Sequence, residues 1–404
     1  MWKSKSSRVD ESWTLPVDLI WEILKLIPVK TLLRCKCVCK LWLSITRDPL
    51  FISSYGGGFK GLLVTRSHHD IYQNHDFFYM NLSPEGHHNN EDVGVSSHIS
   101  EFHTLNLGQP MKSKAPVNGL VCFYHGKNSC IYNIATRETM YLPVSNCDLD
   151  ICDYHLGYDP FNRVYKVLKT CTLNGGRGDC PRPRHKHILN CEILTIGVDS
   201  SWRSIDPAPW ELSSSAYCGN GGLYWDSNFS RSIGVSQFIC FDLVQENFKF
   251  ITKPRMIGTF RWLFGPKPAV ERCSNVFYNN HEGDHPMGPW IDNELRSYKR
   301  ATNFFEDIHN LSSWTEHNIR VPEGKAVTTL PNGDVIFLKS YPSNWKFPMP
   351  FYVYERTSRE LKKRFIADCP SSSIAQECLL NLTEPVVALY YEENITPLGC
   401  LGSS

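Results

Sequence analysis

The stretch from Leu15 to Phe51 carries more apolar surface than so short a segment can bury within itself. Read with a helical period, its first part has a wide apolar stripe on one side and charges on the other, which predicts an amphipathic helix. The stripe consists of Leu19, Ile20, Ile23, Leu24 and Ile27, and the charged side of Asp18, Glu22 and Lys25. Pro16 suits the first turn of this helix, and Pro28 ends it.

Two further helices are predicted in the same stretch. The first runs from Val29 to Arg34, and the second places Val38, Trp42 and Ile45 on one side and ends at Asp48-Pro49. Three helices in so short a segment lie below the size at which a domain usually buries enough surface to be stable alone. The leftover apolar side chains are therefore interpreted as an interface with a partner.

The order of the blocks in this stretch resembles a known family. LP at residues 15–16 is followed by DLIWEIL, LIPVKTLL and CKCVCKLW. This order resembles the F-box, which in its family docks on a Skp-family adaptor and, through it, on the cullin and RING protein of a ubiquitin ligase. The apolar residues that match the F-box are expected to be the chief adaptor contacts. They are Leu15, Pro16, Ile20, Ile23, Leu24, Leu32, Val38 and Trp42.

The charge balance argues against partners other than proteins. Among 404 residues, 42 are Lys or Arg and 41 are Asp or Glu, so no global charge attracts nucleic acid or an anionic membrane. The N-terminus lacks the apolar core of a signal peptide, and no window approaches about 18 apolar residues. The 16 cysteines are therefore expected to be reduced thiols in a cytoplasmic and/or nuclear protein.

After Phe51 the sequence changes to short apolar runs separated by Gly, Asn, Asp and Pro, which is typical of strands and tight turns. Six segments share one pattern of strand, short polar turn and second strand. They are FFYMNLSPEG, CIYNIATRETMYLP, ILTIGVDSSWRSI, FICFDLVQENFKFI, EDIHNLSSWTEHNI and FYVYERTSRELKKRFI. The turn markers Asp199 and Asp242 lie 43 residues apart, which matches the length of a β-propeller blade. A β-sandwich with similar hairpins is the alternative.

Blocks between residues 115 and 251 resemble the plant F-box-associated interaction domain. They are PVNGLVCFY, YNIATRETMYLP, LGYDPFNRVYKVLK, SSWRSI, GGLYWD and FDLVQENFKFI. Family members commonly have Trp-Asn-Pro where this chain has Tyr132-Asn133-Ile134. The resemblance implies an α+β multidomain protein of the F-box/kelch-like kind, in which a three-helix F-box precedes an all-β domain, a kelch-like β-propeller.

The expected domain organisation follows from these features. Residues 1–12 are predicted to be a disordered N-terminus, 13–53 the F-box and 54–404 the β domain. Gly56-Gly57-Gly58 is interpreted as a turn or hinge at the boundary. The polar segment 83–103 shows no periodicity and is predicted to be a flexible loop.

Two cysteine groups contain possible metal ligands, but neither is favoured as a metal site. Cys35, Cys37 and Cys39 are spaced by two, so neighbours on a helix point nearly opposite ways and packing thiols are the better interpretation. A second group offers enough donors for zinc, but its spacing fits no common ligand frame, and a loop joining two strand ends is preferred. It consists of Cys171, Cys180, His185, His187 and Cys191. No metal and no cofactor are predicted.

The sequence carries no catalytic signature: it lacks a GxSxG elbow, HExxH, a phosphate-binding glycine loop and a dinucleotide fingerprint. An enzyme is therefore not expected. Candidate substrate contacts are Trp262 and Trp345, which lie in Pro- and Gly-rich stretches and are expected to be exposed. Arg182 and Arg184 belong to a basic run that either recognises an acidic segment of a target or is simply a solvated loop.

The sequence thus predicts a substrate receptor of a cullin-RING ubiquitin ligase. The F-box would attach to the adaptor, and the β domain would capture a target protein, of unknown identity, for ubiquitination and proteasomal degradation. Two alternatives remain. One is an F-box scaffold that acts outside the ligase, and the other is a propeller enzyme or sugar-binding module in which the F-box match is incidental.

Overall fold

The computed structural model describes most of the helical stretch and the strands of the β part. The described residues are 15–56, 59–67, 74–81, 96–114, 116–145, 151–172, 188–206, 212, 216–219, 221–226, 237–252, 260–264, 275–279, 290–292, 314–316, 325–330, 334–338, 349–355, 358, 360–368 and 387–401. The chain divides into two compact units, Met1–Phe59 and Lys60–Ser404. We call them the helical unit and the β unit. The predicted disordered N-terminus, 1–12, lies outside the described residues.

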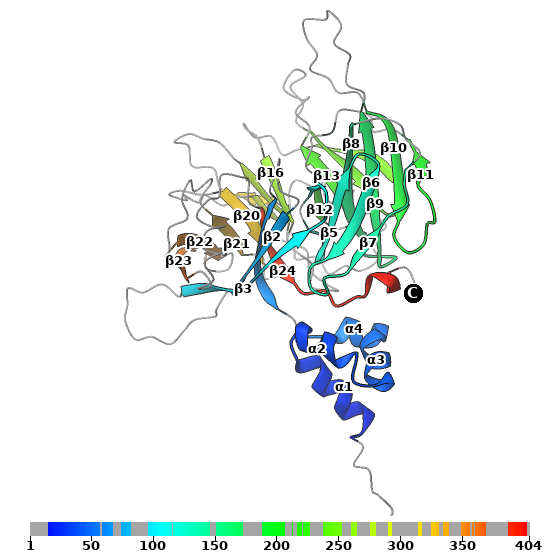
Figure 1. Cartoon of the computed structure of the whole chain (residues 1–404). Helices are drawn as coiled ribbons and strands as arrows, with labels where there is room; N and C mark the ends of the chain where they lie inside the picture. The colour runs from blue at the N-terminus through cyan, green and yellow to red at the C-terminus, as the bar shows by residue number, and fades with distance from the viewer. Residues whose placement is uncertain are drawn as a thin grey trace, which may run out of the picture. The chain divides into compact units, whose positions relative to one another are not determined.

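The described part of the helical unit has four helices, one more than predicted (Figure 1). They are α1 (Val17–Leu26), α2 (Val29–Cys35), α3 (Lys40–Arg47) and α4 (Pro49–Ser54). The sequence predicts only that the third helix ends at Asp48-Pro49. The same two residues also begin α4, because the Asp48 carboxylate accepts a hydrogen bond from the Leu50 amide at 2.7 Å and Pro49 occupies the first helical turn.

The four helices enclose a small apolar core. Its buried side chains include Ile20, Leu24, Val29, Leu32, Ile45 and Phe51. The Trp21 ring meets the Phe51 ring edge to face, with centroids 5.3 Å apart. The Tyr55 hydroxyl donates to the Ile27 carbonyl oxygen at 2.6 Å, which satisfies a backbone group left over where α1 ends. Residues on α1 and at the end of α4 are thus joined within this unit.

The described strands of the β unit form one eight-stranded sheet and four four-stranded sheets (Figure 1). The eight-stranded sheet consists of two antiparallel groups of four strands joined by one parallel pair, so six four-stranded groups can be distinguished. The first group is β1 (Lys60–Ser67), β2 (Asn74–Asn81) and β3 (Ser96–Asn106) together with β24 (Val387–Glu392). The second is β4 (Lys112–Ser113), β5 (Leu120–His125), β6 (Asn128–Asn133) and β7 (Thr139–Tyr141). The third is β8 (Ile151–Asp159), β9 (Val164–Thr172), β10 (Ile188–Thr195) and β11 (Arg203–Ile205).

Three more groups of the same kind complete the described strands. The fourth is β12 (Tyr217–Gly219), β13 (Gly222–Asp226), β14 (Gln237–Asp242) and β15 (Asn247–Thr252). The fifth is β16 (Phe260–Phe264), β17 (Asn275–Asn279), β18 (Trp290–Asp292) and β19 (Trp314–Glu316). The sixth is β20 (Lys325–Thr329), β21 (Val335–Leu338), β22 (Met349–Glu355) and β23 (Glu360–Asp368), and β23 also pairs in parallel with β3.

The two ends of the β unit meet in one sheet. β24 pairs antiparallel with β1, with Lys60 opposite Glu392 and Thr65 opposite Val387. Figure 1 shows the red β24 beside the blue strands of the first group. The last strand of the chain therefore completes the sheet that β1 begins.

Four of the six predicted hairpins are confirmed within the described residues. β6–β7, β10–β11, β14–β15 and β22–β23 each form an antiparallel pair at the predicted place. In the first segment the structure shows β2, but β3 begins only at Ser96, so the two strands are not joined by a short turn. In the fifth segment β19 lies where the second strand was expected, and the residues before it are outside the described ranges.

The predicted flexible loop at 83–103 is wrong for its last eight residues. Residues 96–103 belong to β3, which pairs with β2 across an irregularity at Tyr79 and Met80. Polar residues without alternation predicted a loop, but the partner strand decides the conformation here, since β-propensity depends strongly on context. Residues 82–95 lie outside the described ranges.

Side-chain oxygens at the turns accept hydrogen bonds from backbone amides. Asn133 Oδ1 accepts hydrogen bonds from the amides of Ala135 and Thr136 at 2.9 and 3.1 Å. Asp159 and Asp242 each accept two amides in the same way in the β8–β9 and β14–β15 turns. In the Asn118-Gly119 turn both residues have positive φ, 46° and 80°.

Apolar clusters lie between successive sheets and hold them together. One cluster joins the second and third groups and includes Leu120, Ile131, Tyr154, Val167 and Leu194. Another joins the third and fourth groups through Leu168, Ile193, Leu223, Trp225 and Phe241. The two central strands of the third group, β9 and β10, therefore contribute buried side chains to both clusters, whereas β11 at the edge is largely exposed.

Candidate functional site

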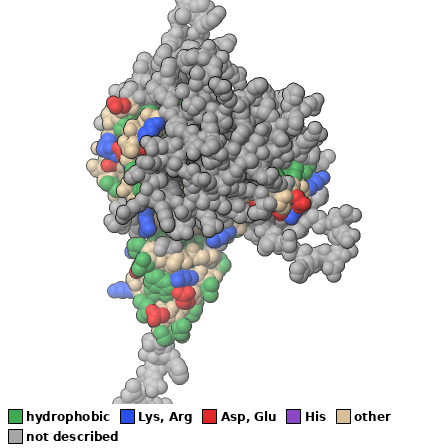
Figure 2. Space-filling view, turned by 180° about the vertical axis from the view of Figure 1, so that it is seen from behind, with side chains coloured by type: hydrophobic (Ala, Val, Ile, Leu, Met, Phe, Trp, Pro, Cys, Tyr) green, Lys and Arg blue, Asp and Glu red, His purple; other side chains and the backbone are tan. Residues whose placement is uncertain are grey.

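The helical unit presents an apolar stripe along α1 and just before it. Leu15, Leu19, Ile23 and Leu26 recur at helical spacing and are all exposed, Leu15 to 55% and Ile23 to 48%. Val38, in the connection between α2 and α3, is 63% exposed. We call these five residues the α1 stripe. Figure 2 shows hydrophobic side chains gathered on the helical unit.

The residues predicted to contact the adaptor divide into two sets. Leu15, Pro16, Ile23 and Val38 are exposed, and Trp42 is half-buried. The other three, Ile20, Leu24 and Leu32, lie in the core. The contact set is corrected on this point, because buried side chains offer no surface to a partner and instead hold the helices in place.

Sequence reasoning omitted some members of this surface. Leu19 was assigned to the apolar stripe but not to the contacts, and Leu26 to neither. The signal that could have found both is the spacing from Leu15, since Leu19, Ile23 and Leu26 follow it by four, eight and eleven residues. α1 has two apolar faces, and the four-residue repeat from Leu15 belongs to the exposed one.

The cysteines near α2 are not all packing thiols. α2 ends at Cys35, which is half-buried, and burial raises the pKa of its thiol. Cys37 and Cys39 lie in the connection between α2 and α3 and are exposed. The prediction that all three pack is wrong for Cys37 and Cys39, because the helix that was expected to carry them begins only at Lys40.

The predicted substrate contacts of the β unit are only partly placed. Trp262 lies in the middle of β16 and not in a connection between strands, so the structural context expected for it is wrong. Regular alternation of Phe260, Trp262 and Phe264 would have favoured the strand. Trp345, Arg182 and Arg184 lie outside the described residues.

The zinc alternative is not compatible with the positions of its two described cysteines. Cys171 on β9 belongs to the cluster between the second and third groups, whereas Cys191 on β10 belongs to the cluster between the third and fourth. The two thiols thus lie on opposite faces of one sheet and cannot bind the same ion. Cys180, His185 and His187 are outside the described ranges, and no group of three metal-ligating side chains occurs among the residues that are described.

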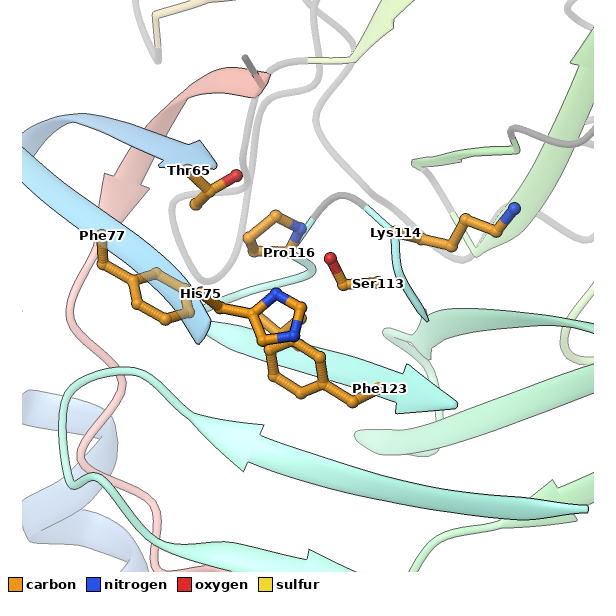
Figure 3. Close-up of a pocket in the computed structure, with 8 residues that line it drawn as sticks. Thr65, His75, Phe77, Ser113, Lys114, Pro116 and Phe123 are labelled. Atoms are coloured by element: carbon orange, nitrogen blue, oxygen red, sulfur yellow. The ribbon is translucent and has the colours of Figure 1, made fainter. Parts of the chain in front are cut away.

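A small pocket lies between the first and second groups (Figure 3). Thr65, His75 and Phe77 come from β1 and β2, and Ser113, Lys114 and Phe123 come from β4, β5 and the residue after β4. The ring centroids of His75 and Phe123 are 4.4 Å apart. The pocket has room for about one water molecule, so it does not fit a substrate.

His155 on β8 is a titratable group in the interior of the β unit. It is almost fully buried, and within the described residues neither of its ring nitrogens has a hydrogen-bond partner. Its ring lies edge to face with Trp225, with centroids 5.1 Å apart. Burial lowers the pKa of His155 to about 3, assisted by the Lys114 ammonium and opposed by the Asp153 carboxylate. His155 is therefore neutral in the folded protein at neutral pH.

This histidine predicts a loss of stability in mild acid. Below pH 6.5 the unfolded chain protonates His155 and the folded protein does not, so stability falls as the pH drops from 6.5 toward about 3. Between pH 7 and pH 5 the wild type should lose about 2 kcal/mol more than His155→Leu. Urea unfolding at both pH values measures this difference. The exposed His125 is the control, and a His125→Leu variant should keep the wild-type slope. Equal slopes for wild type and His155→Leu would contradict the prediction.

No helix in the described part of the chain is long and apolar enough to cross a membrane.

Both units match known families. A model described as the F-box domain matches residues 14–54, and one described as the F-box associated beta propeller domain matches residues 62–273. The two matches follow the order of the helical unit and the β unit.

Relatives of similar length support the same conclusion. The chain is 30% identical over 362 residues to the F-box protein DOR of Arabidopsis thaliana, with 84% of each chain covered. It is 27% identical over 359 residues to F-box only protein 12 of the same plant, covering 84% of this chain and 72% of that one.

Among solved structures, a chain in a nidogen/laminin complex aligns with a TM-score of 0.42 at 8% identity, covering 82% of this chain and 98% of that one.

A helical module followed by a β-sheet body defines a class of two-part proteins, and here both parts match in order. The chain belongs to the family of plant F-box proteins with an F-box-associated domain. F-box proteins generally act as substrate receptors of cullin-RING ligases, and both domain families are typically non-catalytic.

Proposed function

We propose that this protein is a substrate receptor of a cullin-RING ubiquitin ligase, with the α1 stripe and Pro16 docking on a Skp-family adaptor. The observation that carries the proposal is the exposure of the α1 stripe in a unit that matches the F-box. Contiguous exposed apolar side chains favour an interface with another protein. A standard interface would bury roughly 800 Å² on each partner.

We further propose that the β unit is a six-bladed propeller that holds the target protein. Four four-stranded sheets, together with an eight-stranded sheet that divides into two four-stranded groups at the parallel β23–β3 pair, support this number. The pairing of β24 with β1 supports closure of the ring by the last described strand. The third group packs its two faces on the second and fourth groups, as neighbouring blades do. The kelch-like character remains a prediction.

In this function the chain carries out no covalent chemistry. It would hold the target near the ubiquitin-loaded conjugating enzyme. In this way it would raise the effective concentration of the target at that enzyme and orient it. The adaptor brings the cullin and the RING protein. The target is captured by the β unit at a surface that the described residues do not identify.

Adaptor binding tests the proposal. Replacing Leu15 and Pro16 together with Ala, or Ile23 with Asp, should weaken binding of a Skp-family adaptor by at least about tenfold, because each change removes or charges an apolar contact. Val198→Asp is the matched control, since Val198 is 61% exposed but lies in the β unit. Titration of purified adaptor against each full-length variant measures the affinity.

Two outcomes would contradict parts of the proposal. If both α1 variants bind adaptor as well as the wild type, the docking surface is wrong. If the wild type binds adaptor but the complex does not recruit cullin, the alternative of a scaffold outside the ligase is favoured. Circular dichroism of each variant separates lost binding from lost folding.

A further inference from the structure

Two thiols of the third group face each other at the end of a strand pair. Cys152 on β8 lies directly opposite Cys171 on β9 in the antiparallel register. Their sulfur atoms are 3.0 Å apart. Both belong to the cluster between the second and third groups, so they point to the same side of the sheet. Because the strands already place the sulfurs together, a bond between them needs only small side-chain rotations.

Charged side chains lie near this pair of thiols. Lys169 lies two residues before Cys171 on the same face, and its ammonium is 5.7 Å from the centre of the Tyr154 ring, two residues after Cys152. The pKa of Cys152 is lowered to about 7, chiefly by the hydrogen bond with Cys171 and further by Lys169, against the opposing effect of burial. The hydrogen bond from Cys171 and the Lys169 ammonium thus favour the thiolate form of Cys152.

Three other buried thiols provide the contrast. Burial raises the pKa of Cys130 to about 12, and it also raises the pKa values of Cys122 and Cys240. Cys122 and Cys130 lie on neighbouring strands but face Ile131 and Phe123, so they are not opposite each other. Among these buried thiols only Cys152 combines thiolate character with a second thiol within reach.

We propose that Cys152 and Cys171 are a redox-modification site at which hydrogen peroxide forms a reversible disulfide. The Cys152 thiolate attacks one peroxide oxygen, the O–O bond breaks, and Cys152 becomes a sulfenic acid while hydroxide leaves and takes up a proton. The Cys171 sulfur then attacks the Cys152 sulfur, the S–S bond forms and the S–O bond of the sulfenic acid breaks. The leaving oxygen takes up the proton of the Cys171 thiol and departs as water. Two thiols lose two electrons, and one peroxide becomes two waters.

Burial selects the class of oxidant. Cys152 is only 9% exposed and Cys171 is fully buried, so a small neutral peroxide can reach the pair more readily than a bulky disulfide such as oxidised glutathione. The product would join β8 and β9 covalently near Ile151 and Thr172, where the strand pair ends. The modification is independent of the α1 stripe and of adaptor binding.

The test uses the reduced full-length chain and hydrogen peroxide. Thiols are alkylated after treatment, disulfides are then reduced and alkylated with a heavier reagent, and peptides are analysed by mass spectrometry. We expect Cys152 and Cys171 to be linked to each other, to be oxidised at least about tenfold faster than Cys122 or Cys240, and to be restored by dithiothreitol. Equal rates, or a bond from Cys152 to any other cysteine, would overturn the proposal.

Two variants check the order of the steps. In Cys171→Ser the peroxide should leave Cys152 as a sulfenic acid that a dimedone probe captures when the treated protein is unfolded in its presence, since the second thiol is missing. In Cys152→Ser the Cys171 thiol should stay reduced, and its oxidation at the wild-type rate would overturn the assigned roles. The wild-type measurement requires no variant, so the proposal stays testable even if a substitution prevents folding.

Discussion

Glu192→Gln is expected to lower the free energy of unfolding of the β unit by about 3–5 kcal/mol. Lys169 on β9 is fully buried, and its ammonium lies 3.3 Å from the Glu192 carboxylate on β10. The Ser145 hydroxyl accepts a hydrogen bond from Lys169 and donates one to Glu192 at 2.5 Å. The amide of Gln has nearly the same size as the carboxylate, so the variant removes the negative charge and leaves the ammonium in the interior without its counter-ion.

The same substitution in an exposed ion pair shows how much of the expected cost comes from burial. Glu355 and Lys362 form a pair at 2.8 Å on β22 and β23, but both side chains are partly exposed. Glu355→Gln should therefore cost less than about 1 kcal/mol. The double variant Lys169→Met with Glu192→Leu should be more stable than Glu192→Gln alone, because it removes both buried charges together. Urea unfolding followed by circular dichroism measures all three, and a cost below about 1 kcal/mol for Glu192→Gln would contradict the argument.

Asn133→Asp is expected to destabilise the β unit by about 2–4 kcal/mol, because it detaches the segment that follows β24. Asn133 is fully buried, and its Nδ2 donates to the carbonyl oxygens of Asn394 and Thr396 at 2.9 and 3.0 Å. Asp keeps the oxygen that caps the β6–β7 turn but turns the donor into an acceptor facing two carbonyls. Glu138 holds the same segment by accepting the Leu398 amide at 2.9 Å.

The matched change for this prediction is Asn106→Asp. Asn106 also caps its own turn and donates to a second group, the Asn74 side chain, but this contact is exposed and should cost less than about 1 kcal/mol. Hydrogen exchange adds a local readout, since the Leu398 amide should exchange faster in Asn133→Asp than in the wild type. If unfolding and exchange are both unchanged, residues 394–398 are not held through Asn133.

Much of the helical unit was predictable because its signals are local. Pro28 ends α1 and begins α2, and the apolar stripe of α1 is present as expected. The division of that stripe between the core and the surface was not predictable. Ile20 and Leu24 are as apolar as Leu19 and Ile23, and only the packing of α1 on α3 and α4 decides which pair is buried.

In the β unit the hairpins were predictable and their neighbours were not. Turn residues such as Asn133 and Asp242 predict a hairpin, because the side chain binds a backbone amide only a few residues further along the chain. β3 carries no such signal and takes its strand conformation from β2. The periodicity of one segment does not show which other strand it pairs with, so the pairing of β3 could not be predicted.

The sequence by itself determined that a helical segment with excess apolar surface precedes a chain of hairpins, because helical spacing and turn chemistry are properties of neighbouring residues. Only the tertiary structure decided that the α1 stripe, and not Ile20 or Leu24, is the exposed face. It alone joined β24 to β1 and brought Cys152 to Cys171. These relations depend on which distant strands share a sheet, and the free energy that selects the partners comes from burial between sheets and not from any one segment.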